Sequence, residues 1–166
     1  LSDKEIPVTM DGKKNLIING ATDWVYEEEF SMDVAFLWSP DGKKIAFYRF
    51  DESNVKEFNL TFYGELYPKE ERYKYPKAGE ENSKVKIVVY DIAYGKKAEV
   101  FSTDNTWEYI PRMKWTKDPD VLSIQRTNRH QNILELAFYS VSSNTLQVIV
   151  KEENKSFIEI TDDLTF

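Results

Sequence analysis

The sequence contains no cysteine and a single histidine among its 166 residues, and both shortages exclude kinds of chemistry. Without cysteine there is no disulfide, no thiolate metal site and no cysteine nucleophile. The histidine, His130, falls in a polar segment typical of a hairpin turn, and we interpret it as an ordinary turn residue. The chain also lacks a Gly-x-Ser-x-Gly segment, which marks the nucleophile of many serine hydrolases. We therefore expect no catalytic residue, bound metal or cofactor within this chain.

Long apolar runs and an excess of positive charge are missing as well. No stretch of about 18 apolar residues occurs, so we expect no segment that inserts into a membrane. The 22 Lys and Arg residues against 29 Asp and Glu residues give a net charge of −7, which disfavours binding to nucleic acid. Because the chain begins at Leu1 rather than methionine and stops at Phe166, we interpret it as a piece of a longer protein.

Aromatic residues, in contrast, are abundant: the chain has 10 Tyr, 10 Phe and 4 Trp. Aromatic and β-branched residues suit the half-buried surface of a pleated sheet. They gather in short runs separated by turn signals, which predicts an all-β fold of antiparallel strands. The first four runs are residues 34–38, 45–50, 85–92 and 98–101, and the second four are residues 111–115, 121–126, 133–139 and 146–150.

The two sets of strands follow the same pattern. Each set ends its first run at a tryptophan, Trp38 or Trp115, and continues with a turn that contains proline and aspartate. In the first of these turns Pro40 presets the backbone angle φ. A repeated unit of four antiparallel strands is typical of the blades of a β-propeller. We predict one blade at about residues 20–101 and a second at about residues 107–152; because two blades cannot close a ring, the chain ends should belong to neighbouring blades.

Residues 51–83 interrupt the first predicted blade with a long polar segment. The segment is too long for an ordinary hairpin loop and too aromatic for a disordered linker. Its residues 58–63 are themselves a candidate strand. We predict an extended arm whose aromatic side chains need a partner surface, and the alternative is a loop packed back on its own domain. The aromatic residues concerned are Phe58, Tyr63, Tyr67 and Tyr73.

Three consecutive glutamates, Glu27, Glu28 and Glu29, stand out in residues 23–30, DWVYEEEF. Asp23 is a good N-cap for a short helix, and the glutamates then lie at the C-terminal end of that helix. Negative charge is unfavourable there because it faces the negative end of the helix dipole. The arrangement favours a functional role, and an amine is the simplest cation that two adjacent carboxylates could share. A solvated acidic surface is the alternative.

Three strings in the chain resemble one known family. Residues 38–47, WSPDGKKIAF, are similar to a repeat found in many bacterial and exopeptidase propellers. Residues 23–30 resemble the double-glutamate segment of the dipeptidyl peptidase IV family, and residues 75–82 resemble the sequence that follows the arm in the same blade. Because all three occur in the family's order and spacing, the chain is identified as similar to the propeller region of this family, most strongly over residues 20–92.

The resemblance implies part of an eight-bladed N-terminal propeller that covers an α/β-hydrolase domain, which this chain does not include. Members of the family remove X-Pro or X-Ala dipeptides from peptide N termini with a Ser-Asp-His triad. Two glutamates on a short propeller helix bind the free α-amino group of the substrate. The match places these at Glu28 and Glu29, with Glu27 beside them. Two neighbouring carboxylates suit an ammonium group because each accepts a charge-assisted hydrogen bond.

Partners and a location are implied as well. The family forms homodimers partly through an arm that corresponds to about residues 56–81, so we expect a homodimer of the full-length enzyme and substrates that are peptides with a free N terminus. Animal members carry disulfides in the propeller, and the absence of cysteine makes this chain resemble a bacterial member exported to the periplasm or cell surface. Arg126 and Arg129 fall in a matching segment but inherit no catalytic role.

Two other interpretations stay open. One is a non-catalytic propeller that binds another protein, with Glu27, Glu28 and Glu29 solvated. The other is a related tripeptidyl or acyl-peptide exopeptidase. That class predicts a different spacing of the amine-binding residues, and the close match at residues 24–30 disfavours it.

Overall fold

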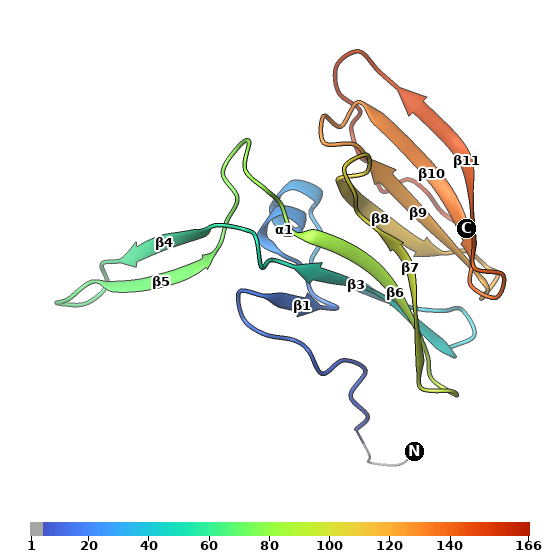
Figure 1. The fold of residues 1–166 in the computed structure, drawn as a ribbon, viewed down its shortest axis with the longest axis horizontal. Coiled ribbons are helices and arrows are strands. Elements are labelled where there is room, and N and C mark those ends of the chain that lie inside the picture. The colour runs from blue at the N-terminus through green and yellow to red at the C-terminus, as the bar shows by residue number, and fades with distance from the viewer. Residues whose placement is uncertain (1–4) are drawn as a thin grey trace.

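The computed structural model describes residues 5–166, and within that range the chain folds into antiparallel β-strands and one short helix (Figure 1). The strands form two larger sheets and a separate two-stranded sheet. The all-β fold class predicted from the sequence is confirmed. No helix within residues 5–166 is long and apolar enough to span a bilayer.

The first sheet has five strands. They are β1 (Ile17–Asn19), β2 (Phe36–Trp38), β3 (Lys44–Asp51), β6 (Lys84–Asp91) and β7 (Lys96–Ser102). β6 pairs with β3 and with β7, whereas β1 and β2 both pair with the other edge of β3. Asn19 lies opposite Arg49 and Phe36 lies opposite Phe47, so β1 and β2 are two halves of one interrupted strand. This sheet therefore includes β1, which precedes the predicted boundary at about residue 20.

The turn between β2 and β3 has the tight geometry expected from its sequence. The N–H of Ser39 donates to the carbonyl of Lys44 at 2.9 Å, and the N–H of Gly42 donates to the carbonyl of Ser39 at 2.9 Å. Gly42 has a φ of +69°, in the left-handed region that favours glycine. The turn fixes the register of β2 on β3 and thereby the place where the interrupted strand resumes.

The second sheet is a meander of four strands. They are β8 (Tyr109–Trp115), β9 (Val121–Thr127), β10 (Ile133–Ser140) and β11 (Thr145–Glu153). Their order in the sheet is their order in the chain, and each neighbouring pair is antiparallel. This is the strand arrangement of a propeller blade.

The two larger sheets share one hydrophobic core. Its most deeply buried large side chains include Phe50, Ile87, Ile110, Leu122 and Ile124. Burial of each such side chain stabilises the fold by about 1.5–3 kcal/mol. A smaller cluster of Phe47, Val88 and Tyr90 occupies the opposite face of the first sheet. Apolar residues on both faces are what a blade packed between two neighbours requires.

The arm is a β-hairpin that projects away from both larger sheets (Figure 1). Its strands are β4 (Glu57–Phe62) and β5 (Lys69–Lys74). Its base is packed, since the ring of Tyr75 lies 4.3 Å from that of Trp24 and also contacts Phe58 and Tyr73. The exposed aromatic side chains at its tip are Phe62, Tyr63 and Tyr67. The four aromatic residues singled out in the sequence are thus divided equally between the base and the tip.

Candidate functional site

Helix α1 (Trp24–Phe30) leaves the first sheet between the two halves of the interrupted strand (Figure 1). The N–H of Gly20 donates to the carbonyl of Tyr48 at 3.0 Å, and the N–H of Tyr48 donates to the carbonyl of Ala35 at 2.9 Å. The chain therefore departs after Gly20 and returns to the same position at Ala35. Gly20 has a φ of +72°, which suits glycine at a sharp exit from a strand. Residues 21–34 are an excursion whose two ends are held together by the sheet.

The N-terminus of α1 is capped as the sequence predicted. The side chain of Asp23 accepts a hydrogen bond from the N–H of Tyr26 at 3.0 Å and another from the hydroxyl of Ser83 at 2.6 Å. Asp23 is buried, and this burial raises the pKa of its carboxyl group against the effect of both hydrogen bonds. Because Ser83 immediately precedes β6, the cap ties α1 to the first sheet.

Tyr26 ties α1 to the second sheet. Its side chain is only 2% exposed, and its hydroxyl accepts a hydrogen bond from the N–H of Ile110 in β8 at 2.9 Å. Its ring packs edge-on against Phe30 and Phe50. Burial raises the pKa of Tyr26 well above its ordinary value, so the hydroxyl stays protonated. The helix is thereby fixed between the two sheets.

The three glutamates lie on the outer side of this fixed helix. Glu27, Glu28 and Glu29 are all exposed, whereas Tyr26 and Phe30 on either side of them are buried. Successive side chains on an α-helix diverge by about 100°, so Glu28 and Glu29 share the outer side without being parallel. The scaffold presents both carboxylates to the outside while holding the backbone beneath them in place.

Arginines near the end of the helix are engaged with other carboxylates. Nε of Arg112 donates to Asp162 at 3.0 Å, and Arg129 pairs with Glu108 at 3.0 Å. In the described part of the chain, the side chains of Glu27 to Glu29 have no hydrogen bond and no ion pair. The result is a cluster of negative charge that forms no ion pair within residues 5–166.

Glu29 borders two hollows, whereas Glu28 lines neither. One hollow, of about 330 Å³, lies between α1 and the base of the arm and is also lined by Lys77 and Arg129. The other, of about 270 Å³, lies beside Arg112 and Phe157. The two glutamates therefore have different surroundings, and Glu29 is the more enclosed of the pair.

Two other residues singled out in the sequence, His130 and Arg126, lie in the second sheet and its turns. His130 is exposed in the turn between β9 and β10. Arg126 pairs with Glu135 at 2.6 Å and lies over the ring of Trp107. Across residues 5–166, no group of three or more His, Asp or Glu residues is arranged to hold a metal ion.

The sequence alone did not indicate two residues that support α1. Ser83 contacts Asp23 from 60 positions away, and Arg112 contacts Phe30 from 82 positions away. The buried side of the helix could be inferred from the apolar spacing of Tyr26 and Phe30. The polar partners carry no such signal because their contacts depend on how the two sheets pack.

The sequence matches one family along its whole length. The model of the family described as "Dipeptidyl peptidase IV (DPP IV) N-terminal region" matches residues 1–166, and the chain belongs to this family. The chain is 33% identical to venom dipeptidyl peptidase 4 of Apis mellifera over 95% of its own length and 22% of that protein. It is 38% identical to a probable dipeptidyl-aminopeptidase B of Ajellomyces capsulatus over 92% of its length and 18% of that protein.

Solved structures agree with this assignment. Dipeptidyl peptidase 4 of Porphyromonas gingivalis superposes with a TM-score of 0.87 at 40% identity, covering 93% of this chain and 22% of that chain. A putative dipeptidyl aminopeptidase IV of Bacteroides ovatus superposes with a TM-score of 0.78 at 28% identity, covering 92% and 21%. The chain spans about a fifth of the length of these relatives.

Proposed function

We propose that this chain is part of the propeller of a serine exopeptidase that releases X-Pro or X-Ala dipeptides, and that Glu28 and Glu29 bind the α-amino group of the substrate. The observation that carries the proposal is a pair of adjacent, exposed carboxylates on a helix anchored to both sheets, with no ion pair to either carboxylate among residues 5–166. The relatives named above are dipeptidyl peptidases, which supports the same reaction.

An ammonium group fits such a pair because it has three N–H donors and one positive charge. Charge-assisted hydrogen bonds of this kind are about twice as strong as neutral ones. Carboxylates on a fixed helix also set how far a peptide can advance, so the bond presented for cleavage lies a constant distance from the N terminus. The chain's contribution to catalysis is then the positioning of substrate.

The test is neutralisation of the pair in the full-length protein. Glu28→Gln and Glu29→Gln each keep the size of the side chain but remove its charge, and Glu27→Gln is the matched control on the same helix. We expect each variant of the pair to lower kcat/KM for Gly-Pro-p-nitroanilide about 10- to 100-fold, since a hydrogen bond to a charged group contributes about 1.5–3 kcal/mol. Undiminished cleavage by the double variant would refute the assignment.

The catalytic residues belong, in this proposal, to an α/β-hydrolase domain outside residues 1–166. An organophosphate that labels activated serines separates this from the alternative of a non-catalytic propeller. We expect stoichiometric labelling of the full-length protein and loss of dipeptide release. Absence of both labelling and peptidase activity favours the protein-binding alternative, in which the glutamates are solvated.

We also propose that the arm contributes to a homodimer of the full-length enzyme. Tyr63 and Tyr67 at its tip are 82% and 80% exposed, beside Leu66 at 91%, and such a group of large exposed side chains is typical of an interaction surface. Replacing all three by serine should shift the sedimentation coefficient of the full-length protein to that of a monomer. An unchanged dimer would remove the tip from the interface.

Export to the periplasm or cell surface of a bacterium is the location we propose, because the chain resembles exported exopeptidases and has no cysteine. Fractionation of the source cells against a cytoplasmic marker enzyme tests it. Recovery of the protein with the cytoplasmic marker would contradict this location.

A further inference from the structure

We infer that Arg112 is a positioning residue that fixes the end of α1 from which Glu28 and Glu29 project. The inference rests on the proposed amine-binding role of these glutamates and adds a residue to it that lies on a different sheet.

The C-terminal end of α1 concentrates negative charge. The last carbonyls of a helix have no partner within the helix and form the negative end of its dipole. Glu28 and Glu29 add two carboxylates at that end, and the last turn of α1 contains no basic residue. A helix of seven residues cannot stabilise such an end by itself. The stabilising cation has to come from elsewhere in the fold.

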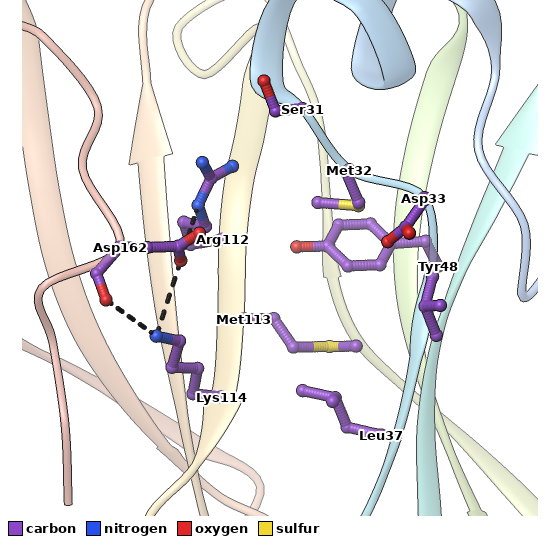
Figure 2. A pocket seen from close by; sticks show the side chains of 10 residues that line it. Ser31, Met32, Asp33, Leu37, Tyr48, Arg112, Met113, Lys114 and Asp162 are labelled. Atoms are coloured by element: carbon purple, nitrogen blue, oxygen red, sulfur yellow. Dashed lines mark hydrogen bonds and ion pairs between the residues drawn. The ribbon is translucent and has the colours of Figure 1, made fainter.

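Arg112 supplies that cation from the second sheet. Its Nη1 donates to the carbonyl of Phe30, the last residue of α1, at 2.8 Å, and to the carbonyl of Pro111 at 2.8 Å. Its Nε donates to Oδ1 of Asp162 at 3.0 Å. Figure 2 shows Arg112 directed toward Ser31, the residue that follows α1, with Asp162 and Lys114 beside it. The side chain of Arg112 is only 15% exposed, so its charge acts in partly desolvated surroundings.

The contacts of Arg112 leave the glutamates available. Its Nη1 donates to two carbonyls and its Nε donates to Asp162, and within the described residues no hydrogen bond of Nη2 and no ion pair to Glu28 or Glu29 is present. Arginine can serve two acceptors in fixed directions because its N–H groups form a planar fork, whereas lysine is a single point charge. Arg112 therefore offsets the charge at the helix end without forming an ion pair with either glutamate, and it borders the same hollow as Glu29.

The chain offers a matched control on the same strand. Lys114 lies two residues from Arg112 in β8, and its Nζ lies 3.4 Å from Oδ1 of Asp162. Its other hydrogen bonds go to the carbonyls of Asp162 and Leu164, and none goes to α1. Removing the charge of Lys114 thus disturbs the same aspartate but leaves the helix contact intact.

The experiment compares Arg112→Met with Lys114→Met in the full-length protein, using Gly-Pro-p-nitroanilide. We expect Arg112→Met to lower kcat/KM about tenfold, mainly through a higher KM, because the loss is one of binding geometry. Lys114→Met should stay within about twofold of the parent protein. Equal effects of the two variants would overturn the inference.

A double-variant comparison separates positioning from general damage. If Arg112 acts through the glutamates, Arg112→Met should have almost no further effect once both glutamates are glutamine. A tenfold loss in both backgrounds would mean that Arg112 is only structural. If the double glutamine variant is itself fully active, the proposed amine site fails, and that result is distinct from a failure of the role of Arg112.

Arg112→Lys covers the case in which Arg112→Met does not fold. This variant keeps the positive charge but not the forked donors, so we expect a melting temperature close to that of the parent and a KM raised about threefold. A KM equal to that of the parent protein would overturn the inference.

Discussion

Two insertions leave the first sheet, and they differ in how they are held. The excursion at residues 21–34 departs from an interrupted strand and is anchored by the cap at Asp23, the buried Tyr26 and the contact of Phe30 with Arg112. The arm between β3 and β6 is packed at its base, and β5 is also contacted from the N-terminal segment, where Lys14 lies 3.4 Å from Glu71 and the side-chain amide of Asn15 donates to the carbonyl of Arg72. Tyr63 and Tyr67 at its tip are exposed. One insertion presents charged groups in fixed positions, and the other presents large exposed side chains.

The difference shows what each insertion is suited for. A small ligand with a single charge requires donors and acceptors that are already in place, because it contributes little energy to ordering them. A protein partner can bury a large surface and can order a protruding hairpin as it binds. The anchored helix therefore suits recognition of a small charged group, and the hairpin with its exposed tip suits association.

Truncation of one tyrosine in each insertion should show most clearly that the two insertions contribute differently to stability. Tyr26→Ala removes a fully buried ring and leaves the N–H of Ile110 without its acceptor, so we expect a loss of about 3–5 kcal/mol in unfolding free energy. Tyr63→Ala at the exposed arm tip should change it by less than about 0.5 kcal/mol. Chemical denaturation of the full-length protein measures both. Similar losses would show that the arm tip is packed.

A second prediction concerns pH and the point where the arm leaves β3. Glu52 is 6% exposed, and its burial, together with the nearby Asp23, raises the pKa of its carboxyl group to about 7. The folded protein thus holds this proton above the ordinary pKa of 4.5. Stability from Glu52 is present below pH 4.5 and is lost as the pH rises toward 7.

Glu52→Gln should remove this loss of stability at higher pH. We expect the variant to be more stable than the parent protein by about 2 kcal/mol at pH 8 and nearly equal to it below pH 5. Glu57→Gln, on the exposed side of β4, is the control and should change stability at neither pH. Denaturation curves at the two pH values provide the measurement. A Glu52→Gln variant that is less stable at pH 8 would mean that Glu52 is held as a carboxylate by a cation.

The sequence predicted elements better than it predicted how they meet. Pro40 and the repeated tryptophans indicated strands and turns that the structure contains, and Asp23 marked the start of α1. These signals are local, so they can be read from a few neighbouring residues. The pairing of β1 with the same edge of β3 as β2 was not predicted, because the hydrogen bonds at Tyr48 join Gly20 to Ala35 across a helix.

The second strand of the arm also could not be predicted from local sequence. β5 consists of Lys69–Lys74, whose sequence KEERYK has neither alternation nor enrichment in β-branched residues. It is a strand because it pairs with β4, whose run at residues 58–63 was recognisable. The candidate glutamates were found from a motif, but Arg112 was not, since its role depends on the packing of one blade against the next.

The smallest predicted effect concerns the aromatic contact between the two insertions. Trp24 of α1 and Tyr75 at the base of the arm have ring centroids 4.3 Å apart in an edge-on arrangement. Aromatic pairs of this kind contribute about 0.5–1.5 kcal/mol beyond their buried area. A double-mutant cycle with Trp24→Leu and Tyr75→Leu should give a coupling energy of about 1 kcal/mol, because the two rings are in direct contact. If the coupling is zero, the two rings are energetically independent, and binding at the arm tip has no route through this contact to the glutamates.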